Sequence, residues 1–378
     1  MKNCLIIAGE KSGEEHALSF MSSMKEISPG CKYWGVGGDE LEKEGMELIY
    51  HLREFSSFGF SEVIGKIPFY FNALKTIEKL AFEKKCKVAI LIDFQDFNMR
   101  LAKKLNKNGI KVLYYVAPQA WAWKAYRAKV IEGCVHSLFT IIPFEKKWFQ
   151  DRGVTRVHSV AHPLWLTYKD ELKDLPKKRP YSEVKSKTRL LLLPGSRNFE
   201  VKNLLPSFIA TKRELEKEFN LEVGLVVSSN VKKELVEPYL DQVDYIWKNE
   251  ELSSALKWAD CSLAASGTVT LATALFNVPT VVTYVGSLLN AFIYYTFLSY
   301  EGFISLANIV HEEEVFSELT QERASTYNMT MELKKIISNQ SIYDDKIMTL
   351  AKTKSLISGG DFDAGEYMGK VIEEAYGN

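Results

Sequence analysis

Short apolar runs recur along the chain, each beside a turn of small or polar residues and a charged, helix-like stretch. The first such runs cover residues 4–8, 87–92 and 111–116. Apolar runs bounded by turn residues predict buried strands, and strands that alternate with helices predict the βαβ units of a parallel sheet. The chain is therefore predicted to have an α/β fold.

The alternation stops between residues 168 and 187, where charged residues and prolines leave few side chains to bury. This segment is interpreted as a linker. After it the cycle restarts, with apolar runs at 189–193, 222–227, 261–264 and 280–284. Ligands of such sheets bind outside the carboxyl ends of the strands. We therefore expect two similar halves that face a central cleft, with the ligand site in that cleft.

The length of the chain also favours two domains. A chain of 378 residues exceeds the roughly 250 to 300 residues at which single cores stop growing. We predict Rossmann-like domains at residues 1–175 and 186–345. Apolar positions at helical spacing in 361–376 predict a helix, and residues 346–378 are expected to form helices that pack back across the domains.

Composition and charge exclude several classes of protein. The apolar fraction of 46% is typical of a globular chain, and Lys plus Arg equals Asp plus Glu at 48 each, so no net charge attracts nucleic acid. The five cysteines include no C-x-x-C pair, which argues against a disulfide framework and a cysteine zinc site. No secretory signal or spanning segment is evident. We expect a cytoplasmic protein without metal or cofactor, and no oligomeric state is predicted.

A strand-to-helix turn in the second half carries groups suited to an anion. Ser196 and Arg197 follow the apolar run 189–193 and a glycine, and Glu200 lies one helical turn later. Free backbone N–H groups at a helix start bind phosphate, and Arg197 adds a charge-assisted contact. The alternative is a tight strand-to-helix turn with a structural role, in which Arg197 pairs with Glu200 and binds no ligand.

A second turn of the same half adds further donors. Ser266, Gly267 and Thr268 follow the apolar run 261–264 and precede a helix-like stretch. Their N–H and hydroxyl groups suit an anion, although Ser266 or Thr268 as a simple helix cap is also common. Two such turns in one domain predict a nucleotide diphosphate site.

A carboxylate at a strand end of the first half is a candidate general base. Asp96 follows the apolar run 87–92 and lies between Phe94 and Phe97, an apolar setting that raises the pKa of a carboxyl group. An aspartate in this place is more often a helix N-cap. His16 and His162 are weaker candidates for a base or a phosphate donor.

Two apolar stretches predict contact with lipid. Residues 55–80 combine aromatic and aliphatic side chains with lysines, which is typical of a helix in a membrane interface or of a buried helix at a domain interface. Residues 288–298 are also apolar. The aromatic segment 114–123 is either core or the lining of an acceptor pocket.

Together and in order, these segments resemble the lipid-A-disaccharide synthase family of GT-B fold glycosyltransferases. The resemblance runs almost from end to end, over residues 8–14, 35–38, 59–74, 93–98, 115–123, 143–145, 162–164, 193–197, 266–268, 305–308 and 318–321. It implies an inverting enzyme that transfers 2,3-diacylglucosamine from UDP onto 2,3-diacylglucosamine 1-phosphate (lipid X). The products are a β-1,6-linked lipid A disaccharide 1-phosphate and UDP, on the way to the lipopolysaccharide of the Gram-negative outer membrane.

The resemblance also implies the roles of individual residues. Asp96 becomes the catalytic base, and a peripheral location on the cytoplasmic face of the inner membrane follows from the acylated substrates. The implied donor site contains Ser196, Arg197, Glu200, Ser266, Gly267, Thr268, Asn308, Glu318 and Gln321, and the implied acceptor site contains Ser12, Gly13, Glu14, Asp93 and Asn98. A sugar-nucleotide epimerase of the same fold and a non-catalytic sugar-nucleotide binding protein are the alternatives.

Overall fold

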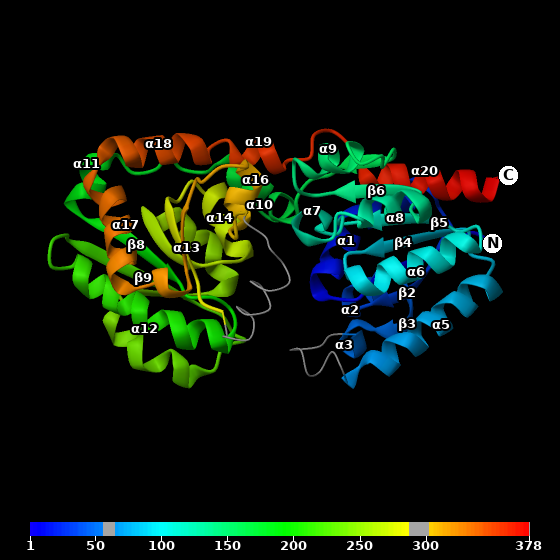
Figure 1. The fold of residues 1–378 in the computed structure, drawn as a ribbon, viewed down its shortest axis with the longest axis horizontal. Coiled ribbons are helices and arrows are strands. Elements are labelled where there is room, and N and C mark those ends of the chain that lie inside the picture. The colour runs from blue at the N-terminus through cyan, green and yellow to red at the C-terminus, as the bar shows by residue number, and fades with distance from the viewer. Residues whose placement is uncertain (56–64, 287–301, 378) are drawn as a thin grey trace. The chain divides into compact units, whose positions relative to one another are not determined.

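The computed structural model describes residues 1–55, 65–286 and 302–377 (Figure 1). The chain divides into two compact units, one of Met1–Leu166 with Ile357–Asn378 and one of Thr167–Leu356. The expected boundaries are 1–175 and 186–345, with 346–378 packing back across the domains; in the structure the second unit begins at Thr167, and the segment 357–378 belongs to the first unit. Among the described residues, no helix has the length and apolar character that a bilayer crossing requires.

The first unit is built on a parallel sheet with the strand order β3-β2-β1-β4-β5-β6-β7. Its strands are β1 (Asn3–Ala8), β2 (Lys32–Gly37), β3 (Glu47–His51), β4 (Val88–Ile92), β5 (Lys111–Tyr115), β6 (Ser137–Thr140) and β7 (Val157–Ser159). Every residue of β1 and β4 is buried, as is usual for strands covered on both faces. The strand order reverses between β1 and β4, where Ala8 pairs with Ile92.

Alternate side chains of this sheet enter two different cores. Leu5 and Ile7 pack with α5 and α6, whereas Cys4 and Ile6 pack with α1 and α20. The helices of the unit are α1 (Lys11–Ile27), α2 (Asp39–Lys43), α3 (Leu52–Phe55), α5 (Ile67–Glu83), α6 (Gln95–Lys107), α7 (Ala120–Trp123), α8 (Arg127–Cys134), α9 (Glu145–Gln150), the start of α10 (Pro163–Lys173) and α20 (Ala364–Gly377).

Helix α20 packs closely against the backbone of α1 and also forms an ion pair with Lys2, just before β1. A Cβ atom on Gly365 would lie 2.3 Å from the carbonyl oxygen of Phe20, and one on Gly369 would lie 2.7 Å from Cβ of Ile27. Lys2 Nζ lies 2.5 Å from a carboxylate oxygen of Glu373. Part of the expected C-terminal segment thus completes the first unit, because these glycines let two helix backbones meet.

The second unit repeats the design with the strand order β10-β9-β8-β11-β12-β13, again parallel. Its strands are β8 (Thr188–Leu193), β9 (Leu221–Val227), β10 (Tyr245–Lys248), β11 (Cys261–Ala265), β12 (Thr280–Tyr284) and β13 (Ser317–Thr320). Its helices are α11 (Tyr181–Ser186), α12 (Asn198–Leu215), α13 (Leu252–Trp258), α14 (Thr268–Leu275), α16 (Leu306–His311), α17 (Thr326–Ser338), α18 (Gln340–Leu350) and α19 (Thr353–Ile357), with 3-10 turns at η1 (Lys233–Leu235), η2 (Glu237–Gln242), η3 (Asn249–Glu251) and η5 (Gln321–Arg323). Here the order reverses between β8 and β11, where Leu193 pairs with Ala264.

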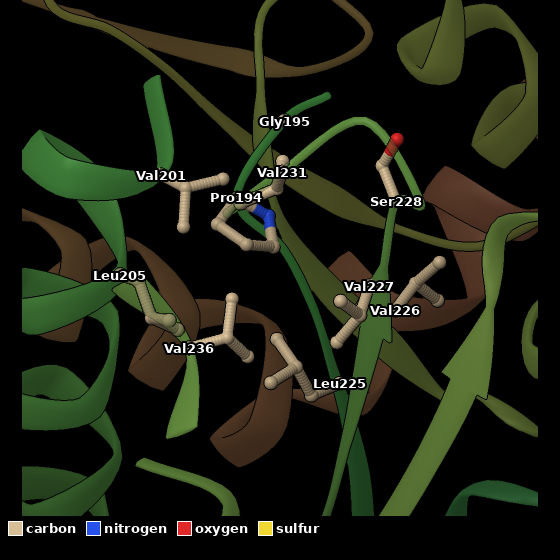
Figure 2. Close-up of a pocket in the computed structure, with 10 residues that line it drawn as sticks. All are labelled: Pro194, Gly195, Val201, Leu205, Leu225, Val226, Val227, Ser228, Val231 and Val236. Carbon is tan, nitrogen blue, oxygen red and sulfur yellow. The ribbon is translucent and has the colours of Figure 1, made fainter. Parts of the chain in front are cut away.

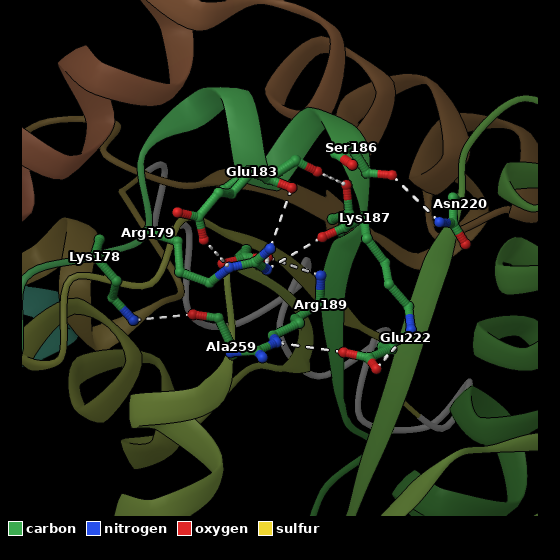
Figure 3. Close-up of polar contacts among 12 residues, drawn as sticks. Lys178, Arg179, Glu183, Ser186, Lys187, Arg189, Asn220, Glu222 and Ala259 are labelled. Carbon is green, nitrogen blue, oxygen red and sulfur yellow. Dashed lines mark hydrogen bonds and ion pairs between the residues drawn. The ribbon is translucent and has the colours of Figure 1, made fainter.

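The segment interpreted as a linker is ordered by polar contacts (Figure 3). Lys178 Nζ donates to the carbonyl oxygens of Leu256 and Ala259, at the end of α13. Arg179 Nη1 lies 2.6 Å from Oδ2 of the buried Asp260. The linker interpretation is therefore wrong: the segment, all of which the structure describes, forms most of α10 and α11, and the apolar pattern gave little sign of it because Leu172 and Val184 are its only buried apolar side chains.

Candidate functional site

The turn after β4 adopts a left-handed backbone beside the end of β1. Asp93 and Phe94 have φ values of 47° and 41°, which residues other than glycine rarely adopt. The Nδ2 group of Asn98 and the hydroxyl of Tyr114 both donate to the carbonyl oxygen of Asp93, each at 2.9 Å. Gly9 makes room for the ring of Phe94, which a Cβ atom there would meet at 3.1 Å. Strained backbone held by several contacts is common at functional sites.

The carboxyl group of Asp93 has a perturbed acidity. Burial, followed by the nearby charge of Glu10, raises its pKa to about 6. A carboxylate with a pKa near neutral pH is well matched to general base catalysis. The raised carboxyl pKa that the sequence predicted for Asp96 is therefore found at Asp93 instead.

Asp96 itself lies in the first turn of α6 with its side chain 74% exposed. Its Oδ1 atom is 2.5 Å from Nη2 of Arg127 and 3.7 Å from Nζ of Lys124. Arg127 also donates to Oε1 of Gln95 at 2.8 Å. The apolar setting expected for Asp96 is wrong, because the helix turns this side chain toward solvent and two cations.

The expected acceptor residues of α1 have different surroundings. Glu14 is buried and accepts hydrogen bonds from the amides of Glu40 and Leu41, at the start of α2, and from Lys11 Nζ at 2.7 Å. Burial opposes ionisation, but these donors lower the pKa of Glu14. Glu14 thus holds α2 in place, while Ser12 is exposed at the first turn and Gly13 is buried against Ala8.

The two histidine candidates are buried. Burial lowers the pKa of His16 to about 4, and burial together with His16 lowers the pKa of His162 to about 3. The Nδ1 atom of His162 accepts from the amide of Leu164 at 3.2 Å. Both rings are therefore uncharged at neutral pH, which does not favour binding of an anion.

In the second unit, the amides of the turn after β8 bind the carboxylate of Glu200, a side chain of the same helix start. The Oε2 atom of Glu200 accepts from the amides of Ser196 at 3.1 Å and Arg197 at 3.3 Å. Its other oxygen pairs with Nη1 of Arg197 at 2.8 Å. Gly195 leaves room for this carboxylate, because a Cβ atom there would lie 2.4 Å from Oε2. The alternative pairing of Arg197 with Glu200 is thus observed, and it places a carboxylate on the very amides expected to bind phosphate.

A shallow apolar depression, too small to hold a water molecule, lies beneath this turn (Figure 2). Pro194 and Gly195 form one side of it, and Ser228 is its only polar side chain among the lining residues that the structure describes. The remaining lining residues are Val201, Leu205, Leu225, Val226, Val227, Val231 and Val236. The side chains beneath the Ser196–Arg197 turn are therefore mainly apolar.

The expected donor residues after β11 and β13 form one hydrogen-bonded group. Ser266 Oγ donates to the carbonyl oxygen of Ile304 at 3.0 Å. Glu318 accepts from the amides of Ile304 and Ser305 and from Nδ2 of Asn308, the last at 2.9 Å. Asn308 is fully buried, so it and Glu318 order the segment that reaches Ser266.

Of the other residues expected to bind the donor, two are exposed to solvent and one has a left-handed backbone. Gly267 and Thr268 are exposed at the start of α14, which follows the strand paired with β8. Gln321 has a φ of 49°, and its Nε2 atom approaches Gly286. Residues 56–64 and 288–298, part of the predicted lipid contacts, lie outside the described residues.

Sequence reasoning missed two features of the first unit. The buried Glu145 accepts a hydrogen bond from Nε1 of Trp121 at 3.0 Å, and the buried Arg127 pairs with Asp96. The triplet 143–145 contributed to the family resemblance but gave no role to Glu145. Its burial could not be inferred from a charged residue next to a strand end.

Two Rossmann-like units, each with polar groups at the point where its strand order reverses, define a GT-B type α/β enzyme. A family model described as lipid-A-disaccharide synthetase matches residues 4–365, and the chain belongs to that family. It is accordingly a glycosyltransferase of lipid A biosynthesis.

Similar proteins agree with this assignment. The lipid-A-disaccharide synthase of Myxococcus xanthus is 32% identical over 88% of this chain and 87% of its own length. That of Francisella philomiragia is 32% identical over 90% of each. Among solved structures, an S. aureus MnaA–UDP structure has a TM-score of 0.56 at 13% identity, covering 98% of this chain and 95% of that one. The calicheamicin glycosyltransferase CalG4 has a TM-score of 0.58 at 12% identity, covering 100% and 99%. These structures show the fold alone.

Replacing Asp93 by asparagine is expected to stabilise the protein at high pH. The folded pKa of about 6 exceeds the ordinary value of 3.8, so ionisation of Asp93 costs stability as pH rises through 6. Asparagine carries no charge and tolerates the left-handed backbone. Asp93→Asn should raise the free energy of unfolding by about 1 to 3 kcal/mol at pH 8 and by much less at pH 4, measured by urea denaturation. An equal effect at both pH values would contradict the assigned acidity.

Proposed function

We propose that this enzyme condenses UDP-2,3-diacylglucosamine with 2,3-diacylglucosamine 1-phosphate to give a β-1,6-linked disaccharide 1-phosphate and UDP. Membership of the family is the ground for the substrates. The observation that supports the chemistry is the strained turn at Asp93, which holds a carboxyl group of raised pKa at the reversal point of the first sheet. The second unit contributes the anion-suited turn at Ser196 and Arg197.

In this proposal, Asp93 is the general base. Inverting transfer requires one group to take the proton of the acceptor 6-hydroxyl as its oxygen attacks the anomeric carbon. Asp93 matches this task better than Asp96, whose carboxylate is exposed and paired with Arg127. The role of Asp96 is then to hold Arg127 and Lys124 beside the turn, within reach of a phosphorylated acceptor.

The donor diphosphate is proposed to bind at the start of α12. Its leaving oxygen gains negative charge in the transition state, and the amides of Ser196 and Arg197 with the Arg197 guanidinium are suited to stabilise it. The carboxylate of Glu200 must leave these amides first, since it occupies them in the free protein. Ser266 and Thr268 supply further donors from the adjacent strand end.

Substitution of the two aspartates should separate their roles. Asp93→Asn removes the proposed base and should lower kcat by about 100-fold to 10,000-fold. Asp96→Asn keeps the side-chain size and should lower turnover by less than about tenfold, because an exposed ion pair contributes little. The measurement is UDP release from UDP-2,3-diacylglucosamine with and without the acceptor.

Two outcomes of that assay would contradict the proposal. UDP release or sugar conversion that does not require the acceptor would support hydrolysis or an epimerase, and a larger loss in Asp96→Asn than in Asp93→Asn would make Asp96 the base. The wild-type rate should also rise with pH through about 6, and this limb should persist in Asp96→Asn.

Removing the charge of Glu200 should tighten UDP binding. In Glu200→Gln no carboxylate competes for the amides, so the Kd of UDP should fall by about twofold to fivefold, the effect of one exposed ion pair. Glu214→Gln is the matched control, because Glu214 is on the same helix and pairs with Lys217 at the same spacing. Weaker UDP binding in Glu200→Gln, measured by calorimetry, would mean that Glu200 positions Arg197 for the ligand instead.

We further propose that α5 contacts the cytoplasmic face of the inner membrane, where the acylated substrates reside. Ile67 and Phe71 are 44% and 49% exposed near its start, with Lys75 also exposed. An apolar stripe beside a lysine suits a lipid interface. Phe71→Ser should reduce co-sedimentation with anionic phospholipid vesicles, whereas Phe199→Ser, an exposed phenylalanine of α12, should not. Equal sedimentation of wild type and Phe71→Ser would overturn this contact.

A further inference from the structure

Glu145 is a carboxyl group buried without a cation at its side chain in the described part of the chain. It is the first residue of α9 and is 1% exposed. Oε1 accepts from the indole Nε1 of Trp121 at 3.0 Å, and Oε2 accepts from the amide of Ile142 at 3.3 Å. The ring of Trp121 also packs edge-on against Phe144, with centroids 5.2 Å apart. Trp121 is therefore held by a polar contact with the Glu145 carboxylate and an aromatic contact with the neighbouring Phe144.

The charge of Glu145 costs stability near neutral pH. Burial raises its pKa to about 7, against weaker opposing contributions from Trp121 and the amides of Ile142 and Ile141, which are the groups that face it. Because the folded pKa lies above the ordinary value, stability falls as pH rises through 7. A glutamine carries no charge, but its single amide oxygen could accept from only one of the two N–H groups of Trp121 and Ile142, and its NH2 group would face the other. A residue whose charge is unfavourable for folding points to a role beyond folding.

The tryptophan that Glu145 holds belongs to a short element next to the Asp93 turn. Helix α7 is a single turn of four residues, too short to be stable without outside contacts. It follows the end of β5, the strand paired with β4, after Val116 with a left-handed φ of 65°. Directly after α7, Lys124 and Arg127 approach the Asp96 carboxylate. Lys124 directly follows α7 and Arg127 begins the next helix, α8, so α7 leads into the segment that carries both cations.

We propose that Glu145 is a positioning residue for glycosyl transfer, which through Trp121 fixes α7 and with it Lys124 and Arg127 beside the Asp93–Asp96 turn. This inference rests on the proposed function for the role of that turn. Glu145 acts through Trp121 and touches no reacting atom. When Glu145 is ionised, the hydrogen bond that its carboxylate accepts from the Trp121 indole is charge-assisted. Protonation of the carboxylate weakens this bond. The ordering of α7 is therefore expected to increase as pH rises through 7.

The test compares Glu145→Gln with Glu132→Gln, in which a half-buried carboxylate of the same unit that accepts from Thr155 is replaced. At pH 8, Glu145→Gln should turn over about tenfold more slowly than wild type, a loss within the range of mispositioned catalytic groups. The Kd of UDP should be unchanged. Wild-type tryptophan emission should show a transition near pH 7 that Glu145→Gln and Trp121→Phe both lack. Glu132→Gln should match wild type in every readout.

Two further outcomes would overturn the inference. Turnover of Glu145→Gln within about twofold of wild type at pH 8 would leave Glu145 without a positioning role. A fluorescence transition that persists in Trp121→Phe would assign it to another of the seven tryptophans. If Glu145→Gln does not fold, Trp121→Phe should show the loss of turnover, since it keeps an aromatic ring beside Phe144 but has no N–H donor for Glu145.

Failure of the proposed function is recognisable separately. In that case the wild-type enzyme would not release UDP in an acceptor-dependent manner, while the fluorescence transition near pH 7 would still report the contact between Glu145 and Trp121. If the wild-type enzyme is active and shows the fluorescence transition, but Glu145→Gln has the turnover of wild type, only the positioning role is refuted.

Discussion

In each parallel sheet, the strand order reverses at one place, so the helical connections on either side of it run in opposite directions. The polar groups of the candidate site are accessible because they lie at these two places. At the carboxyl ends of β1 and β4, and of β8 and β11, no crossover helix covers the gap between the strands. Backbone amides and short polar side chains can therefore stay accessible beside strands that are otherwise fully buried. Asp93 and the Ser196–Arg197 turn occupy these two places, each fixed by the register of the strands before it.

Carboxylates with the same intrinsic chemistry differ here because their neighbours differ. Glu14 receives two amides and a lysine and stays ionised, Asp96 is solvated beside Arg127, and Asp93 lies among apolar groups that favour its protonated form. Glu200 shows a further use, as an internal occupant of an anion-binding turn. The environment of each group, more than its residue type, thus divides structural from chemical roles.

Much of the fold follows from the sequence because buried parallel strands are continuous apolar runs. The runs at 4–8, 87–92 and 189–193 all became central strands, and the turn at Ser196 and Arg197 was found from its place after one of them. The choice between Asp93 and Asp96 could not be made, since it depends on a left-handed turn that reverses which carboxylate is buried. The order in segment 168–187 and the burial of Glu145 were equally hidden, because both arise from partners far away in sequence.

The glycine contacts between α1 and α20 have a consequence for biosynthesis. All of the second unit is encoded between these two helices, so a ribosome translates it before the partner of α1 exists. The second unit can fold on the nascent chain, whereas the apolar face of α1 that carries Phe20 and Met24 remains uncovered until α20 leaves the exit tunnel. The earliest-made helix is thus the last whose packing is completed.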